Sequence, residues 1–117
     1  MKIGVIKETQ KGEKRVAISP NISKLLIEKG FELLVEEDAG LASSYKNSDY
    51  ESAGAKIVSR ETLFNESTVL IKINPFDEDD LKLVNNTQIL MRQFSQKSHA
   101  AIIHSTTPPS PTNRMLN

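Results

Sequence analysis

Two basic residues, Arg15 and Lys72, carry side chains of a type and placement that can do chemistry. Arg15 follows a strand-like run and a charged loop, and a guanidinium holds a carboxylate or a phosphate by two parallel hydrogen bonds. Lys72 interrupts the apolar run 69–73, and a partly buried ammonium polarises a carbonyl or pairs with an anion. We predict that both side chains face one crevice at the carboxyl ends of strands, where α/β sheets usually bind small ligands.

Each of these two residues also has an interpretation without function. Arg15 lies in the charged run 11–15, and such runs are usually solvated at the surface. Lys72 can extend its aliphatic stem along the strand end and place its ammonium in water. The residues alone leave both alternatives open.

The other polar candidates are interpreted as structural. His99 and His104 have no Asp, Glu or Cys at the spacing of a metal site, so no metal ligand is predicted. The acidic run 77–80 is typical of a helix cap and first turn. The five glycines, at positions 4, 12, 30, 40 and 54, form neither Gly-x-Gly-x-x-Gly nor a phosphate-binding loop. We therefore expect no nucleotide cofactor to bind tightly to this chain alone.

The elements that position these residues begin with a strand over 3–6 and a helix over 20–29. Ser19 is a typical N-cap, proline is favoured at the next position, and a glycine follows the last turn. The apolar run 31–35 follows at once, which completes a β-α-β unit. Within the helix, three apolar residues at helical spacing are predicted to form the buried face: Ile22, Leu25 and Leu26.

The same alternation continues along the chain. Residues 48–51 match a capping box before a short helix, 56–58 form a short strand, and Ser59 caps a further turn. Residues 68–73 are the most strand-like run, which we place centrally in the sheet. Asp77 caps a helix over 78–84, and 87–91 return as a strand. This order predicts an α/β fold with a doubly wound, mainly parallel sheet, a flavodoxin-like or Rossmann-like shell that is incomplete.

The character of the sequence changes after Met91. Residues 92–97 have no clear period, and residues 106–112 are rich in Pro, Ser and Thr. We therefore divide the chain into a domain at 1–91 and a divergent, largely disordered tail at 92–117. Residues 100–103 are compatible with a turn of helix or with an edge strand, and four residues do not decide between the two.

Composition excludes several classes of function. Fifteen basic residues balance fifteen acidic residues among 117, so the charge does not favour nucleic acid or an anionic membrane as a partner. The absence of cysteine excludes disulfides and thiol chemistry. The first residues are too polar for a secretory signal and the apolar runs are too short to cross a bilayer, so we expect a cytoplasmic location.

Several ordered blocks of the sequence resemble one known family. From Met1 to about Met91 the chain is similar to the N-terminal part of the family that contains alanine dehydrogenase and the alpha subunit of the proton-translocating NAD(P) transhydrogenase. Within the family, Ala42-Ser43 and Lys72-Ile-Asn-Pro75 look more like the transhydrogenase, because alanine dehydrogenases usually have Lys-Val-Lys-Glu-Pro in the second block. The matching blocks are Lys2-Ile-Gly-Val-Ile-Lys-Glu8, Arg15-Val-Ala-Ile-Ser-Pro20, Gly30-Phe-Glu-Leu-Leu-Val-Glu36, Ala39-Gly40, Ala53-Gly-Ala55 and Val69-Leu-Ile-Lys-Ile-Asn-Pro75.

The resemblance implies a cofactor, partners and site residues. The full transhydrogenase alpha subunit binds NAD(H) in a second, Rossmann domain and passes a hydride to NADP(H) on a partner subunit while protons cross the membrane. The implied partners are that Rossmann domain, the beta subunit or membrane domains, and a second copy of the full-length subunit in a homodimer. In alanine dehydrogenase the residues matching Arg15 and Lys72 hold the substrate's carboxylate and carbonyl, whereas a transhydrogenase has no such substrate.

The sequence also departs from the family pattern, and these departures limit what the resemblance implies. Residues 92–96 fit neither member of the family, and His99 does not occupy the place of the catalytic histidine of alanine dehydrogenase, so no catalytic residue is assigned. The Gly-rich turn of the nucleotide-binding half is absent, and we expect a catalytically incomplete chain. We interpret the change after Met91 as a truncated or frame-shifted reading of a longer gene. The alternatives to a transhydrogenase fragment are an alanine dehydrogenase-type fragment and a non-catalytic α/β interaction module.

Overall fold

The computed structural model describes residues 1–93 and 101–105, the second range as backbone alone. None of the helices in these ranges is long and apolar enough to span a bilayer. The elements, in chain order, are β1 (Lys2–Val5), α1 (Pro20–Glu28), β2 (Glu32–Glu36), the 3₁₀ turn η1 (Leu41–Ser43), α2 (Asn47–Ser52), β3 (Lys56–Val58), α3 (Arg60–Glu66), β4 (Val69–Lys72), α4 (Glu78–Leu83), β5 (Ile89–Gln93) and β6 (Ala101–Ser105).

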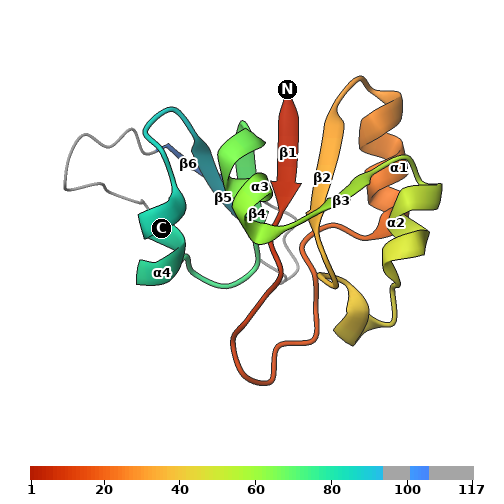
Figure 1. The fold of residues 1–117 in the computed structure, drawn as a ribbon, viewed down its shortest axis with the longest axis horizontal. Helices are drawn as coiled ribbons and strands as arrows, with labels where there is room; N and C mark the ends of the chain where they lie inside the picture. Colours follow the sequence, from red (N-terminus) through yellow and green to blue (C-terminus); the bar gives the residue numbers. More distant parts are fainter. Residues whose placement is uncertain (94–100, 106–117) are drawn as a thin grey trace.

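The strands form one sheet in the order β3-β2-β1-β4-β5-β6 (Figure 1). The first five strands run parallel, and β6 pairs antiparallel with β5. This confirms the predicted α/β class and the central place of β4. Residues 101–105, which overlap the segment 100–103 that the sequence left undecided, form a strand. Residues 94–100 and 106–117, which include most of the predicted disordered tail, lie outside the described residues.

The direction of winding reverses between β1 and β4. The chain first moves outward from β1 through β2 to β3, and α3 then carries it back across the sheet to β4 on the other side of β1. In sheets of this kind the loops after the two strands at the reversal diverge and leave a crevice at their carboxyl ends. Here those loops are 6–19 and 73–77, which contain Arg15 and Asn74.

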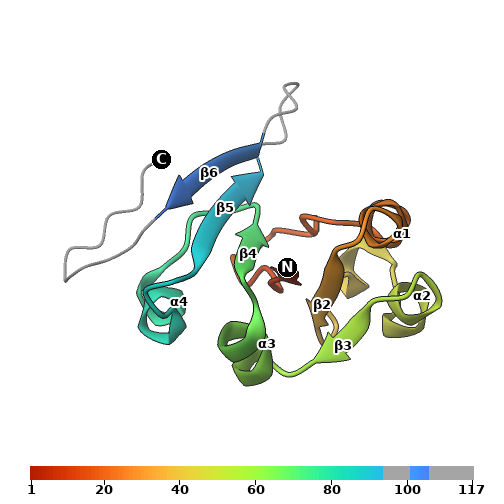
Figure 2. The same cartoon turned by 90° about the horizontal axis from the view of Figure 1, so that it is seen from above.

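Helices cover the two faces of the sheet in pairs, as Figure 2 shows from above. Side chains alternate along each strand, so each strand contributes to both cores. The core under α1 and α2 contains Val5, Leu33, Val35, Tyr50 and Ile71 among others. The core under α3 and α4 contains Ile6, Leu34, Leu63, Phe64, Leu70, Phe76 and Leu90. Lys72 follows Leu70 by two residues, which places it on the α3/α4 face.

The buried face of α1 differs from the predicted one. Leu26 packs against the core as predicted, together with Ile27, and Ser23 is completely buried. Ile22 and Leu25 instead remain 45% and 52% exposed. The prediction was wrong for these two residues because it followed hydrophobicity alone, whereas the helix buries the small, polar Ser23.

Most helix starts follow the predicted capping chemistry, and one does not. The side chains of Ser19, Ser59 and Asp77 accept hydrogen bonds from the backbone N–H groups of their first turns. In α2, however, Ser48 is not the cap. The helix begins at Asn47 with Lys46 as its N-cap, two residues before the predicted cap, and the Asp49 carboxylate reaches back to accept the Lys46 N–H at 2.7 Å.

Gly4 lies in the buried centre of β1 because α3 approaches it closely. A Cβ atom at this position would lie 2.1 Å from Ser67 Oγ and 3.2 Å from Leu63 Cδ1. We expect Gly4→Ala to lower the free energy of unfolding by about 1–3 kcal/mol through overpacking, measured by urea denaturation.

The matched variants at residue 67 make this test specific. Within the described part of the chain the buried Ser67 Oγ has no hydrogen-bond partner, so Ser67→Ala alone should be neutral or stabilising. Ser67→Gly should recover part of the loss in the Gly4→Ala background. Equal losses with and without the change at residue 67 would show that the close approach is not the cause.

Candidate functional site

Glu8 joins the two loops at the reversal point. Its buried carboxylate accepts the backbone N–H of Ile73 at 2.7 Å through Oε2. Its Oε1 accepts the backbone N–H of Asn74 at 3.1 Å and the Asn74 side-chain Nδ2 at 3.0 Å. The carboxylate therefore satisfies backbone donors that the end of β4 leaves without a strand partner, and it fixes the loop after β4 against the loop after β1.

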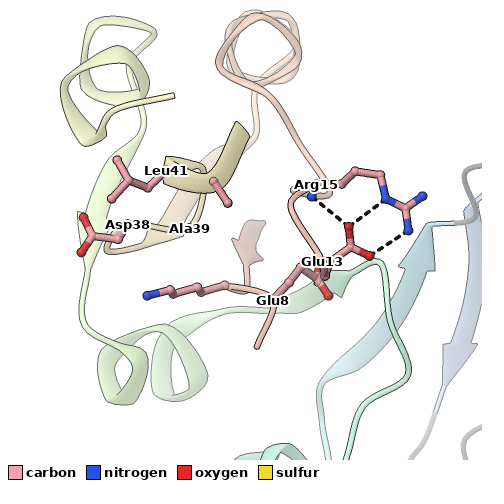
Figure 3. A pocket seen from close by; sticks show the side chains of 8 residues that line it. Glu8, Glu13, Arg15, Asp38, Ala39 and Leu41 are labelled. Atoms are coloured by element: carbon pink, nitrogen blue, oxygen red, sulfur yellow. Dashed lines mark hydrogen bonds and ion pairs between the residues drawn. The ribbon is translucent and has the colours of Figure 1, made fainter. Parts of the chain in front are cut away.

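Arg15 is held by a carboxylate of its own loop. Its Nε donates to Glu13 Oε2 and its Nη2 donates to Glu13 Oε1, both at 2.8 Å, as Figure 3 shows. The backbone N–H of Arg15 also donates to Glu13 Oε2 at 2.8 Å, and Asn74 Nδ2 donates to Oε1 at 3.1 Å. The Glu13 side chain is 8% exposed, whereas that of Arg15 is 53% exposed. The pair therefore buries the anion and leaves the cation accessible to solvent.

This geometry shifts the protonation equilibria of both partners. The hydrogen bonds from the Arg15 side chain are the main cause that lowers the pKa of Glu13 to about 2, and the Arg15 backbone and Asn74 add to the effect. The same hydrogen bonds raise the pKa of Arg15 above its ordinary value. Both groups are therefore charged at any physiological pH.

A cavity of about 330 Å³ lies beside the ion pair. In Figure 3 the Arg15 guanidinium reaches away from Asp38 and Leu41, which stand on the far side of this cavity. Among residues 1–93 and 101–105, no group of three or more His, Cys, Asp and Glu side chains is arranged to hold a metal ion. The cavity is lined by Lys7, Glu8, Glu13, Arg15, Asp38, Ala39, Leu41 and Ala42.

Two further contacts hold the loop that carries Arg15. Ser43 Oγ, in η1, donates to the backbone carbonyl of Lys14 at 2.5 Å. Tyr50, which is completely buried in α2, donates its hydroxyl to the carbonyl of Ile18 at 2.8 Å. Burial raises the pKa of Tyr50, so the phenol remains a neutral donor. The loop 6–19 is thus held by hydrogen bonds to the η1 turn and to the core under α1 and α2.

Lys72 is paired with a different carboxylate, that of Asp80. Its side chain is 4% exposed, and its Nζ donates to Asp80 Oδ2 at 3.1 Å on the α3/α4 face. It lines a second cavity of about 380 Å³ together with Thr9, Gln10, Asn74, Pro75, Phe76 and Asp77. Neither of these two cavities is lined by both Arg15 and Lys72, although Asn74, which lines the cavity beside Lys72, also donates to the Glu13 carboxylate that holds Arg15. That both cations face one crevice stays a prediction.

Asp80 organises the charges around Lys72. Its Oδ1 pairs with Arg60 Nη2, and Arg60 Nη1 pairs in turn with Glu36 Oε1 at 3.2 Å. Asp80 also completes a capping box with Asp77, whose pKa is lowered mainly by the hydrogen bond from the Asp80 N–H. One buried carboxylate thus anchors β4, α3 and the start of α4.

Sequence reasoning did not find several of these residues, although some left a signal. The spacing of Asp77 and Asp80 matches a capping box, and Glu8 directly follows the first strand. Nothing in the local sequence marks Glu13 or Arg60 as partners of the two cations. His104 lies in β6, where its backbone pairs in register with Leu90, and His99 lies outside the described residues.

Removing Asp80 should destabilise the domain strongly. Asp80→Ala leaves the buried Lys72 ammonium without its carboxylate, and we expect a loss of about 3–5 kcal/mol in the free energy of unfolding. Lys72→Met should cost less, because Asp80 keeps Arg60 and its helix-cap contacts. Denaturant unfolding measures both.

Asp79→Ala is the matched control for this series. Asp79 neighbours Asp80 on the same helix, and its side chain is 88% exposed. Its removal should cost less than about 1 kcal/mol. If Asp80→Ala and Asp79→Ala cost the same, the buried ion cluster does not anchor the domain.

The Glu13–Arg15 pair should break only at strongly acidic pH, when the Glu13 carboxylate is protonated. Because the folded-state pKa of Glu13 is depressed, the pair stabilises the folded loop above the ordinary pKa of 4.5, and this contribution is lost as the pH falls from there through about 2. The carboxyl ¹³C shift of Glu13 should report a midpoint near 2. Arg15→Met should raise the midpoint toward 4.5, and Lys14→Met should leave it unchanged. An unchanged midpoint in Arg15→Met would contradict the assigned cause.

Comparisons with known proteins place the chain in a family. A family model described as "Alanine dehydrogenase/PNT, N-terminal domain" matches residues 4–107. Alanine dehydrogenase from Staphylococcus haemolyticus is 40% identical over 90 residues, which cover 77% of this chain and 24% of that protein. Alanine dehydrogenase 1 from Staphylococcus aureus is 36% identical over the same length. The chain therefore spans about a quarter of the length of the curated relatives that it matches.

Solved structures of both branches share the fold. A transhydrogenase from Sinorhizobium meliloti superposes with a TM-score of 0.73 at 27% identity, over 77% of this chain and 27% of that one. An L-alanine dehydrogenase superposes with a TM-score of 0.75 at 29% identity, over 81% of this chain and 26% of that one. By the match of the family model and by these relatives, the chain belongs to the alanine dehydrogenase/PNT N-terminal domain family.

Proposed function

We propose that this chain supplies the N-terminal domain of an NAD(P) transhydrogenase alpha subunit, in which it supports hydride transfer without binding a small substrate. The observation that supports this proposal is that each of the two cations is already paired with a carboxylate of the chain. Arg15 is engaged by Glu13 on the loop after β1, and Lys72 is engaged by Asp80 on the α3/α4 face.

A small oxo acid needs a different arrangement. A guanidinium that holds the carboxylate and an ammonium that polarises the carbonyl must act at one place, because the reacting groups have to be held together in one geometry. In the described residues the side chain that meets Glu8 and Glu13 across the crevice is Asn74, which is neutral. An enzyme that passes a hydride between two nucleotides has no use for a two-cation clamp.

The cofactors and partners follow from this proposal. Since the sequence contains no Gly-rich nucleotide fingerprint, NAD(H) binds to a Rossmann domain outside this chain and NADP(H) to a partner subunit. This chain is then catalytically incomplete by itself, and it works on the cytoplasmic side of a proton-translocating complex whose alpha subunits form a homodimer.

An alanine dehydrogenase-type function is the second candidate. The Staphylococcus relatives at 36–40% identity are alanine dehydrogenases. The half-exposed Arg15 also borders a cavity of about 330 Å³, which is large enough for a small oxo acid. In this function Arg15 and Lys72 bind the substrate, which replaces Glu13 and Asp80 as their partners.

A proton–nitrogen correlation spectrum of the whole chain distinguishes the two candidates. The spectrum is recorded alone, with NADH and then with pyruvate, and the Arg15 side-chain Nε–Hε signal is followed in particular. The transhydrogenase proposal expects dispersed signals and no specific shifts with either compound.

Pyruvate shifts at Arg15 and around Lys72 would favour the alanine dehydrogenase function. Such shifts should disappear in Arg15→Met and persist in the neighbouring control Lys14→Met. Specific shifts with NADH would instead overturn the assignment of the cofactor to a domain outside this chain.

A further inference from the structure

One segment of the chain supplies hydrogen bonds to two carbonyl groups of the loop after β1. Ser43 Oγ donates to the carbonyl of Lys14 at 2.5 Å, and the Tyr50 hydroxyl donates to the carbonyl of Ile18 at 2.8 Å. Both donors lie in residues 38–50, which run from the end of β2 through η1 into α2 and which we call the clasp. The clasp therefore holds residues 14–18 at both ends.

The clasp is also a wall of the cavity beside the loop. Its residues Asp38, Ala39, Leu41 and Ala42 line one side of the cavity of about 330 Å³, and residues of the loop 6–19 line the other, as Figure 3 shows. Because the clasp forms one wall and is hydrogen-bonded to the other, the contact between them sets the width of the cavity.

Two backbone positions in the clasp are unfavourable by themselves. Asp38 and Ser44 have φ values of 62° and 72°, in the left-handed region that residues with a side chain seldom adopt. Asn47 stabilises the first of them, because its Oδ1 accepts the Asp38 N–H at 2.8 Å and its Nδ2 donates to Asp38 Oδ1 at 3.1 Å. Such conformations persist where surrounding contacts determine them, and they cluster at ligand clamps and switch regions.

Gly40 leaves the room that the Tyr50 hydroxyl needs. A Cβ atom at position 40 would lie 2.8 Å from the hydroxyl oxygen and from Cε2 of Tyr50, and 2.9 Å from Cβ of Tyr45. Tyr50 is completely buried, and a close-packed interior gives its ring little space to move aside. The Ala39-Gly40 block of the sequence thus serves the contact between Tyr50 and Ile18.

The start of the loop is held more strongly than residues 14–18. The carboxylate of Glu8 accepts the backbone N–H of Ile73 at 2.7 Å, and hydrogen bonds to an ionised acceptor are roughly twice as strong as those between neutral groups. The bonds to the carbonyls of Lys14 and Ile18 come from neutral hydroxyl groups. We therefore expect residues 14–18 to move before Glu8 does.

We propose that Tyr50 is a positioning residue that, together with Ser43, holds residues 14–18 against the clasp, and that release of this contact is the motion that opens the cavity. The inference goes beyond the proposed function, because it concerns how the wall of the crevice is held and applies to either candidate function. Whatever enters the cavity meets a wall whose movement requires Ile18 to leave Tyr50.

Amide hydrogen exchange of the full chain, followed by proton–nitrogen spectra, tests the role of Tyr50. Ala17 and Ile18 are each 6% exposed, so exchange at their amides requires the loop to open. Tyr50→Phe keeps the ring and removes the hydroxyl. It should accelerate exchange at Ala17 and Ile18 by about three- to tenfold, as the loss of one hydrogen bond predicts, and leave the buried Leu70 in β4 unchanged.

Two further variants make this test specific. Tyr45→Phe removes a hydroxyl from the neighbouring ring, which packs edge-to-face on Tyr50 at 6.3 Å between centroids, and should not change exchange at Ala17 or Ile18. Ser43→Ala removes the other donor at a half-buried position and should also accelerate exchange, so it decides the question should Tyr50→Phe fail to fold.

Three results would overturn the positioning role. They are unchanged exchange at Ala17 and Ile18 in a folded Tyr50→Phe chain, an equal acceleration in Tyr45→Phe, and an equal acceleration at Leu70. The last result is what a merely structural role predicts, because general loss of stability exposes the strands as well as the loop.

Opening of the cavity has a readout of its own. A neutral gadolinium chelate in the solvent accelerates the relaxation of nearby protons, and Ala39 in the cavity wall is 7% exposed. The chelate should relax the Ala39 methyl protons more strongly in Tyr50→Phe than in the unmodified chain. Faster exchange at Ile18 without this change would contradict opening of the cavity. Neither measurement uses NADH or pyruvate, so a failure here leaves the proposed function to its own test.

Discussion

The arrangement of this domain depends on the ion pairs that the buried carboxylate of Asp80 makes with Lys72 and Arg60. An ammonium in a central strand is unfavourable unless a partner compensates for its lost hydration, and Lys72 in β4 has that partner in α4. Asp80 also pairs with Arg60 at the start of α3, and Arg60 extends the cluster to Glu36 at the end of β2. Because Glu36 in turn accepts the N–H of Lys7, the charges connect the elements of the α3/α4 face with the loop after β1. The carboxyl edge of this face is therefore held by directional contacts that fix how α3 and α4 lie against β2 and β4.

A second carboxylate system organises the other part of the same edge. Glu8 and Glu13 both accept donors from Asn74, and Glu13 fixes Arg15. Each buried carboxylate here compensates donors that the end of a strand or a loop leaves unpaired, so hydrogen bonds join the loop after β1 to the loop after β4. A crevice of this kind is suited to hold loops in place. It offers a small anionic ligand less than the presence of Arg15 suggests, since that guanidinium is already paired with Glu13.

The sequence predicted the parts of the structure that local chemistry determines. Caps at Ser19, Ser59 and Asp77 and the central place of β4 depend on residues close together in the chain, and all were predicted correctly. The buried face of α1 was predicted only in part, because the burial of the polar Ser23 is a property of packing that hydrophobicity does not encode. Arg15 follows β1 and Lys72 ends β4, as the sequence predicted. The partner of Lys72, however, is Asp80, which lies 8 residues further along the chain and meets Lys72 only in the fold.

A matching position in a family is therefore not the same as a matching role. The fold of this chain is shared with a transhydrogenase and with an L-alanine dehydrogenase to a similar degree, so fold alone does not choose between them. What a cation does is set by its nearest charged neighbours: Glu13 for Arg15, and Asp80 for Lys72. Since Coulomb attraction falls with distance and a bidentate contact uses a whole edge of the guanidinium, a ligand must first displace these neighbours before it can use either residue. The assignment of function within the family thus depends less on the presence of Arg15 and Lys72 than on the strength with which this chain holds them.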